Sequence, residues 1–222
     1  MKIAILGAGS WGTALGQVLQ ENGSEVCLWH FDDDFVKQIN QTYIHPFLPR
    51  LHLNSNLLFT SSLYEIFQYG DMLLSALPSQ VVRKVLNQYD QPYSKPIISV
   101  SKGIENKTCN RMSEIICETL KLSIDDIVVL SGPSHAEEVA KKYPTAIVAA
   151  SENQDNAILV QKLFSNEYFR VYTSQDIVGV EFGGAAKNII ALAAGICHGA
   201  GYGDNTMAAL VTRGLEEIIR LG

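Results

Sequence analysis

The chain has 222 residues, of which 47% are hydrophobic and 18% charged, as in a folded protein of one large domain or two small ones. Acidic residues outnumber basic ones by 23 to 17, giving a net charge of -6, and no cationic run could line a nucleic-acid backbone. The four cysteines lack CxxC spacing, and the N-terminus has no cationic signal region. We therefore expect a reduced, cytoplasmic protein that binds neither nucleic acid nor a metal.

A glycine-rich turn follows the first apolar segment. Lys2–Leu6 predicts a short strand, and Gly7, Gly9 and Gly12 stand in the spacing GxGxxG before the helical pattern of residues 11–22. The first glycine permits a tight turn, the second lets the backbone approach a pyrophosphate, and the third lets helix and strand pack closely. The phosphates then lie at the positive helix N-terminus. This segment predicts a dinucleotide-binding site.

Side chains near this turn are candidates for coenzyme contacts. Ser10 and Trp11 stand where the loop meets the helix, and each either contacts the coenzyme or packs within the fold. Glu25–Trp29 predicts the second strand, after which an acid that binds the adenosine ribose is expected. The aspartates at 32–34 fit that role, and they equally fit the N-cap and first turn of a helix over residues 35–42. No arginine stands here to accept a 2′-phosphate, which favours NAD over NADP.

Strand-like and helical segments alternate after a long connection at residues 43–57. Strands are predicted at 71–77, 96–100, 127–130, 145–150 and 169–173, with helices between them at 80–89, 108–120, 136–142 and 156–164. The alternation predicts an α/β fold with a doubly wound, mostly parallel sheet. Polar turns follow three strands, at residues 77–79, 101–103 and 131–134. Together at one sheet edge they would bind a small anionic or carbonyl substrate.

Residues 176–199 predict a long apolar helix that carries one unusual charge, Lys187. The neighbours on its face are small apart from one histidine: Gly183, Gly184, Ala191, Ala194 and His198. Glu181 lies off this face and is not placed as a helical ion-pair partner. A lysine beside apolar surface without such a partner suits proton transfer, because its charged form is disfavoured. The alternative is a solvated lysine on an interfacial helix.

The strand pattern ceases at residue 176, and residues 204–221 predict a further amphipathic helix. We expect a dinucleotide-binding domain over residues 1–175, followed by the beginning of a helical substrate domain over residues 176–222. The apolar segment at 177–197 approaches the length of a membrane span. Its internal charges and glycines argue instead for burial within protein, so no membrane span is predicted.

Six blocks in order along the chain point to a family. They are GAGSWGTAL near the N-terminus, SKGIE at 101–105, LSGPSHAEEVA at 130–140, PTA at 144–146, GVEFGGAAKNIIALAAGI at 179–196 and the closing AALVTRGLEEIIRLG. These blocks resemble the bacterial NAD(P)-dependent glycerol-3-phosphate dehydrogenases, and SGPS and GGxxKN are far more specific than GxGxxG. The family's Rossmann domain followed by an all-helical domain fits the change of pattern at Asp176.

The resemblance implies an oxidoreductase that interconverts dihydroxyacetone phosphate and sn-glycerol 3-phosphate by hydride transfer with NAD or NADP, for glycerophospholipid synthesis. Lys187 matches the family's catalytic acid/base. The implied substrate contacts are Lys102, Gly132, Ser134 and Lys187, and the implied coenzyme contacts are Gly7, Gly9, Ser10, Trp11, Gly12, Phe31, Lys102 and Ala136. The substrate is a small molecule, and a homodimer is one alternative for the oligomeric state.

Several positions depart from the family pattern: Phe31 replaces a basic or polar residue, His135 a Phe, His198 an Asp and Met207 an Arg. Phe31 leaves the choice between NAD and NADP open. Family members continue for about a further hundred residues, a length typical of a second domain, and those residues complete the substrate site. We therefore expect the chain as given to bind coenzyme, to turn over substrate poorly and to expose apolar helix faces.

Two other functions stay open at this point. One is a related Rossmann-plus-helical dehydrogenase for a hydroxy acid, which also uses a helix lysine near an asparagine. The other is a dinucleotide-binding module without turnover. Assays with both substrate types separate the two enzymes, and coenzyme binding without catalysis in a folded sample would indicate the module.

Overall fold

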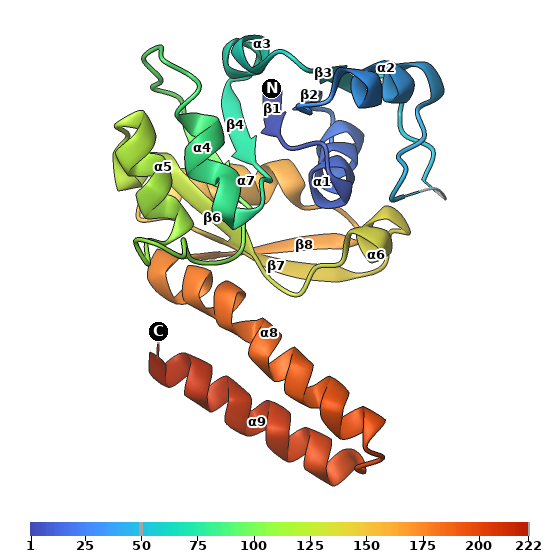
Figure 1. Cartoon of the computed structure of the whole chain (residues 1–222), viewed down its shortest axis with the longest axis vertical. Helices are drawn as coiled ribbons and strands as arrows, with labels where there is room; N and C mark the ends of the chain where they lie inside the picture. The colour runs from blue at the N-terminus through green and yellow to red at the C-terminus, as the bar shows by residue number, and fades with distance from the viewer. Residues whose placement is uncertain (49–50, 222) are drawn as a thin grey trace.

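An eight-stranded sheet forms the centre of the computed structural model, which describes residues 1–48 and 51–221 (Figure 1). Three residues lie outside the described part of the chain. They are Pro49 and Arg50, in the predicted long connection, and Gly222, the last residue of the predicted helical domain. The strands are β1 (Lys2–Leu6), β2 (Glu25–Trp29), β3 (Leu58–Thr60), β4 (Met72–Ser75), β5 (Ile97–Ser99), β6 (Ile127–Ser131), β7 (Thr145–Ala150) and β8 (Phe169–Ser174). The helices are α1 (Ser10–Glu21), α2 (Asp33–Thr42), α3 (Leu63–Tyr69), η1 (Ser79–Val81), α4 (Val82–Leu86), α5 (Met112–Leu120), η2 (Ile124–Asp126), α6 (Ala136–Ala140), α7 (Gln154–Phe164), α8 (Ile177–Gly199) and α9 (Asp204–Leu221).

The sheet has the strand order β3-β2-β1-β4-β5-β6-β7-β8. Neighbouring strands of the described chain run parallel, apart from the antiparallel pair β6 and β7. The order reverses direction beside β1, where β2 lies on one side and β4 on the other. The predicted doubly wound, mostly parallel α/β fold is confirmed, and ligands are expected where the chain reverses direction.

Both faces of the sheet are covered by helices, which explains why its strands are apolar at nearly every position. In β1, Ile3 and Ile5 belong to one core with residues of α1, α2, α6 and α7. Their neighbours Ala4 and Leu6 belong to the opposite core with residues of α3, α4 and α5. Alternate residues of one strand thus enter two separate cores, because successive side chains point to opposite faces.

Three elements were not predicted from the sequence: β3, α3 and the short helix η2. β3 and α3 fill residues 58–69, and β3 is a three-residue edge strand, too short for an alternating pattern. One predicted helix boundary was wrong: α5 begins at Met112, whereas the sequence predicted a start at residue 108. Residues before Met112 instead form a tight loop, closed by the bridge between Ile104 and Arg111. Local pattern does not detect a loop that is held by contacts with distant residues.

Helices α8 and α9 form a pair that extends away from the sheet (Figure 1). They cross closely at Gly214, where an added Cβ would lie 2.5 Å from Ile190 Cδ1. Large apolar side chains on this pair are exposed: Ile189, Leu192, Ile196, Val211, Leu215, Ile219 and Leu221. By length and composition alone α8 could span a membrane. However, α8 packs on β6 and β7, and its buried residues, Ile177 and Glu181, lie in its first half.

A buried carboxylate fastens α8 to the sheet domain. Glu181 is 7% exposed, and its Oε1 accepts the Ser113 N–H at 2.8 Å. Its Oε2 accepts from the Ser113 hydroxyl at 2.6 Å and from Arg111 Nη1 at 2.9 Å. Burial raises the pKa of Glu181, against the opposing effects of Ser113 and Arg111. As expected, Glu181 has no partner on its own helix; it joins α8 to the start of α5.

We predict that Glu181→Gln lowers the free energy of unfolding by about 2 kcal/mol or more, because the buried carboxylate that pairs with the partly buried Arg111 would become an amide. The matched control is Glu114→Gln, which also removes a carboxylate from Arg111 but at a side chain that is 45% exposed. We expect that control to cost less than about 1 kcal/mol. Urea unfolding measures both values, and equal losses would contradict the proposed role of Glu181 as the anchor.

Candidate active site

The carboxyl ends of β1, β4 and β5 open into a cavity of about 630 Å³. The glycine turn and all three predicted polar turns, after β4, β5 and β6, reach this cavity. Its walls include Gly7, Gly9, Ser10, Trp11, Gly12, Leu77, Pro78, Ser79, Ser101, Lys102, Ser134 and Ala136. The prediction that these turns meet at one sheet edge is confirmed.

The glycine turn presents bare backbone at the mouth of α1. Gly7 has φ +113°, a left-handed conformation that favours glycine. A Cβ on Gly12 would lie 2.0 Å from the Gly7 carbonyl oxygen, whereas a Cβ on Gly9 would meet no atom within 4 Å. Gly9 is the N-cap of α1, no side chain caps the helix, and its first turn carries no acid. The helix N-terminus can therefore receive a pyrophosphate, so these residues fit the dinucleotide.

A buried histidine that was not predicted from the sequence supports this turn through a hydrogen bond. His45 is fully buried in the connection between α2 and β3, with Nε2 at 3.0 Å from the Ala8 carbonyl oxygen. Its Nδ1 accepts the Phe47 N–H at 3.2 Å, so the ring proton is on Nε2 and is donated to Ala8. Burial lowers the pKa of His45, which favours this neutral form. The long connection thus positions the glycine turn.

The end of β2 forms the opposite wall of the cavity. His30 and Phe31 line it, with ring centroids 4.6 Å apart, and Phe31 is 77% exposed. Burial lowers the pKa of His30. Asp32 is the N-cap of α2, since its Oδ1 accepts from Asp34 N and Phe35 N at 2.9 and 3.3 Å. The capping role predicted for these aspartates is confirmed for Asp32, and a ribose contact stays a prediction.

Two lysines from distant parts of the chain converge on one backbone oxygen. Lys102 Nζ follows β5, and Lys187 Nζ comes from α8; each donates to the Gly132 carbonyl oxygen at 3.1 Å. Lys102 Nζ also donates to the Ser134 hydroxyl at 3.1 Å. Gly132 is compressed against β7, because an added Cβ would lie 3.0 Å from Ile147 Cα. The loop after β6 therefore holds two ammonium groups side by side.

Small residues let α8 come close enough for this arrangement. A Cβ on Gly184 would lie 2.7 Å from the Ser131 hydroxyl oxygen and 3.9 Å from Lys102 Cγ. Gly183, Gly184 and Lys187 line a second cavity of about 280 Å³ with the loop after β6. The small-residue face predicted beside Lys187 therefore meets the sheet edge at two glycines of α8, Gly183 and Gly184.

Burial and the neighbouring positive charge of Lys187 lower the pKa of Lys102 to about 8. Its ammonium also lies 5.9 Å from the centroid of the Trp11 ring, a cation–π distance. Below about pH 8 Lys102 is still mostly protonated, so its ammonium can hold a negative charge placed beside it. Among the described residues, no group of three or more His, Cys, Asp and Glu side chains could hold a metal ion.

Family models match nearly all of this architecture. Residues 2–157 match the N-terminus of NAD-dependent glycerol-3-phosphate dehydrogenase, and residues 176–222 match its C-terminus. The chain belongs to this family. It is 50% identical over 225 residues to the Bacillus subtilis glycerol-3-phosphate dehydrogenase [NAD(P)+], covering 100% of the chain and 65% of that relative. The Enterococcus faecalis enzyme of the same name is also 50% identical, with 66% of its length covered.

Solved structures of family members have the same fold. The glycerol-3-phosphate dehydrogenase of Coxiella burnetii is 35% identical, with a TM-score of 0.88 over 99% of the chain and 68% of that structure. The Plasmodium falciparum enzyme is 27% identical, with a TM-score of 0.90 over 100% of the chain and 66% of that structure. The resemblance found in the sequence blocks is therefore confirmed. The roles of individual site residues stay predictions, although those implied by the family all line one of the two cavities.

We predict different outcomes for two glycines of the turn. Gly9→Val should leave the melting temperature nearly unchanged, since its side chain enters open space. It should weaken NADH binding about tenfold or more, because the side chain occupies the path of the pyrophosphate. Gly12→Val should lower the melting temperature markedly, because its Cβ would overlap Gly7. Calorimetry with and without NADH distinguishes these effects, and normal NADH binding by Gly9→Val would contradict the assignment.

Replacing Lys187 by methionine should raise the pKa of Lys102 above about 8, because a repelling charge is removed while burial remains. Competitive acylation of the amine as a function of pH, read by mass spectrometry, gives the midpoint for Lys102. Lys107→Met removes an exposed lysine from the same loop and serves as the control. An unchanged midpoint in Lys187→Met would mean that the two ammonium groups are not neighbours in solution.

Proposed function

We propose that this chain carries the coenzyme site and the proton-transferring lysine of an NAD(P)-dependent glycerol-3-phosphate dehydrogenase. The reaction interconverts dihydroxyacetone phosphate and sn-glycerol 3-phosphate and supplies glycerophospholipid synthesis. The observation that carries the proposal is the pair Lys102 and Lys187 on the Gly132 carbonyl, beside a cavity walled by the glycine turn. The chain spans 65% of the length of the Bacillus subtilis relative, so the activity is proposed from the site rather than transferred whole.

The two lysines have complementary roles in this proposal. When bound at the glycine turn, the coenzyme would supply the hydride for the carbonyl carbon of dihydroxyacetone phosphate, or take one from the carbinol carbon of glycerol 3-phosphate. As the carbonyl electron pair moves onto oxygen, Lys187 donates a proton from Nζ to that oxygen and becomes a neutral amine. Lys102 keeps its charge near the same oxygen and stabilises the developing negative charge. In the reverse direction the neutral Lys187 accepts the hydroxyl proton of glycerol 3-phosphate.

Coenzyme contacts follow from the walls of the cavity. Gly9 leaves room for the pyrophosphate in the turn that Gly7 and Gly12 allow, and Ser10, Trp11 and Ala136 line the same space. We propose NAD(H) as the preferred form, because Phe31 lines the adenosine end of the cavity and the aspartates at 32–34 follow it directly in the chain. A 2′-phosphate there would meet an apolar ring and negative charge, with no lysine or arginine among the lining residues of that wall.

The proposed organisation has a Rossmann domain over residues 1–175 and helical substrate-domain sequence over 176–222. The change from strand to helix between β8 and α8 supports this division. We propose a soluble, cytoplasmic protein without a membrane span, because Glu181 and Lys187 of the apolar helix α8 are bonded to the sheet domain. The proposed partner is a small-molecule substrate, and a homodimer stays an alternative.

The decisive test uses the purified chain, NADH and dihydroxyacetone phosphate. NADH should bind and be consumed slowly, and NADPH should bind more weakly. Lys187→Ala should lower the rate about 10² to 10⁴-fold while the dissociation constant of NADH stays within a few-fold, since the lysine acts on the substrate oxygen. Absorbance at about 340 nm measures the consumption of NADH, and tryptophan fluorescence measures the binding of NADH.

Each other outcome identifies a different function. Oxidation of a hydroxy acid instead of glycerol 3-phosphate would indicate the related dehydrogenase. NADH binding without turnover of either substrate would indicate a binding module. A Lys187→Ala variant that keeps most of its rate would remove Lys187 from the mechanism.

A further inference from the structure

The loop that carries Lys102 is bonded to the turn after β4 on one side of the lysine and packs closely on that turn on the other side. Before Lys102, the Ser101 hydroxyl donates to the Leu77 carbonyl oxygen at 2.6 Å. After Lys102, Gly103 has φ +126°, and an added Cβ would lie 2.8 Å from the Ser79 hydroxyl oxygen. Leu77 and Ser79 also line the coenzyme cavity. The position of Lys102 is therefore set by contacts with the coenzyme wall.

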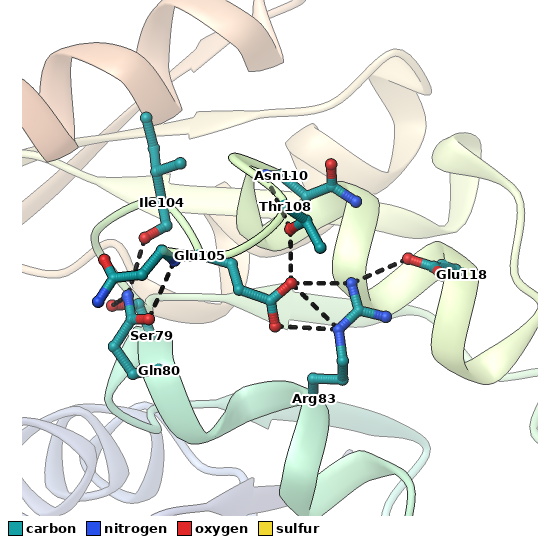
Figure 2. A network of polar contacts seen from close by, with 9 residues as sticks. Ser79, Gln80, Arg83, Ile104, Glu105, Thr108, Asn110 and Glu118 are labelled. Carbon is teal, nitrogen blue, oxygen red and sulfur yellow. Dashed lines mark hydrogen bonds and ion pairs between the residues drawn. The ribbon is translucent and has the colours of Figure 1, made fainter.

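An ion pair and an amide side chain hold the far end of this loop, as Figure 2 shows. Arg83, on α4, donates from Nε to Glu105 Oε1 at 2.9 Å and from Nη2 to Oε2 at 3.0 Å. The Thr108 hydroxyl donates to the same Oε2 at 2.6 Å. The Glu105 side chain is 14% exposed, and its bonds from Arg83 lower its pKa. The carboxylate is thus held in its charged form by three donor atoms.

Gln80 adds a second attachment one turn before Arg83. Its Nε2 donates to the Ile104 carbonyl oxygen at 2.8 Å, and its Oε1 accepts the Asn106 N–H at 3.1 Å (Figure 2). The backbone on both sides of Glu105 is therefore bonded to a side chain of η1. Because two bonds through one amide fix both distance and orientation, this part of the loop cannot slide along α4 without losing both.

We propose that Glu105, held by Arg83 and Gln80, is a positioning residue that sets Lys102 against Gly132 and Ser134. Glu105 touches neither lysine nor cavity and acts through the loop. The inference rests on the proposed function for its catalytic meaning, but the placement of Lys102 is testable without turnover. The fixed loop keeps Lys102 in its buried position beside Lys187, where its ammonium would contact the substrate oxygen.

Glu105→Gln and Glu118→Gln form a matched pair for the test. Each removes one carboxylate from Arg83, whose Nη2 also contacts Glu118 at 2.9 Å, but only Glu105 lies on the lysine loop. The readout is the pH dependence of Lys102 acylation, together with the NADH dissociation constant and the melting temperature. Gln80→Ala, at an exposed residue, is the second variant in case Glu105→Gln does not fold.

In Glu105→Gln and in Gln80→Ala, Lys102 should become more solvated and its pKa should rise from about 8 by about one unit. Its free-amine fraction at about pH 8 would then fall about fivefold. Loss of the Glu105 charge alone would lower the pKa, so the direction separates positioning from direct electrostatics. Glu118→Gln should leave the midpoint unchanged.

Equal shifts in Glu105→Gln and Glu118→Gln, or no shift in Glu105→Gln and Gln80→Ala, would overturn the proposal. A fall in the melting temperature without a change in the pKa of Lys102 would mean that the Arg83–Glu105 ion pair contributes only to stability. That result would also overturn the proposal. These outcomes do not depend on turnover of dihydroxyacetone phosphate. Failure of the inference and failure of the proposed function therefore give different results.

Discussion

The Gly132 carbonyl oxygen accepts hydrogen bonds from two lysine ammonium groups, and the rest of the site is arranged around that shared acceptor. Two neighbouring positive charges repel each other, so each lysine must be held in place by other contacts in the fold. Ser134 is the second acceptor for Lys102, and burial with the nearby charge of Lys187 lowers the pKa of Lys102. In the proposed reaction, a substrate oxygen that becomes negative during hydride transfer would relieve this repulsion more than the neutral carbonyl oxygen does, so the arrangement would favour the transition state over the bound substrate.

The supports come from three separate parts of the fold. The loop after β6 supplies Gly132, which is pressed against β7. The loop after β5 supplies Lys102 and is bonded to the turn after β4. Helix α8 supplies Lys187 and is anchored by Glu181 to the start of α5. Each support crosses from one strand end to another, so the site depends on the whole sheet edge.

The coenzyme side of the cavity shows a different strategy. Here the useful property is the absence of side chains, at Gly9 above all, over an uncapped helix N-terminus. The bare backbone would be mobile if unsupported. His45 provides support through its bond to the Ala8 carbonyl, from a connection far away in the sequence. The hydrogen bond from His45 thus offsets the backbone flexibility of the glycines, which lack the side chains that would block a phosphate.

The sequence by itself determined the α/β class, the glycine turn and the three polar turns and singled out Lys187 as a candidate, because these depend on local periodicity, glycine spacing and short motifs. The tertiary structure decided what those residues do together. Gly132 as a shared acceptor, Glu181 as the partner of Arg111, His45 beneath Ala8 and the Arg83–Glu105 pair all join residues well apart in sequence. Periodicity carries no information about such pairs, since it records which face a residue occupies and not which distant residue lies opposite.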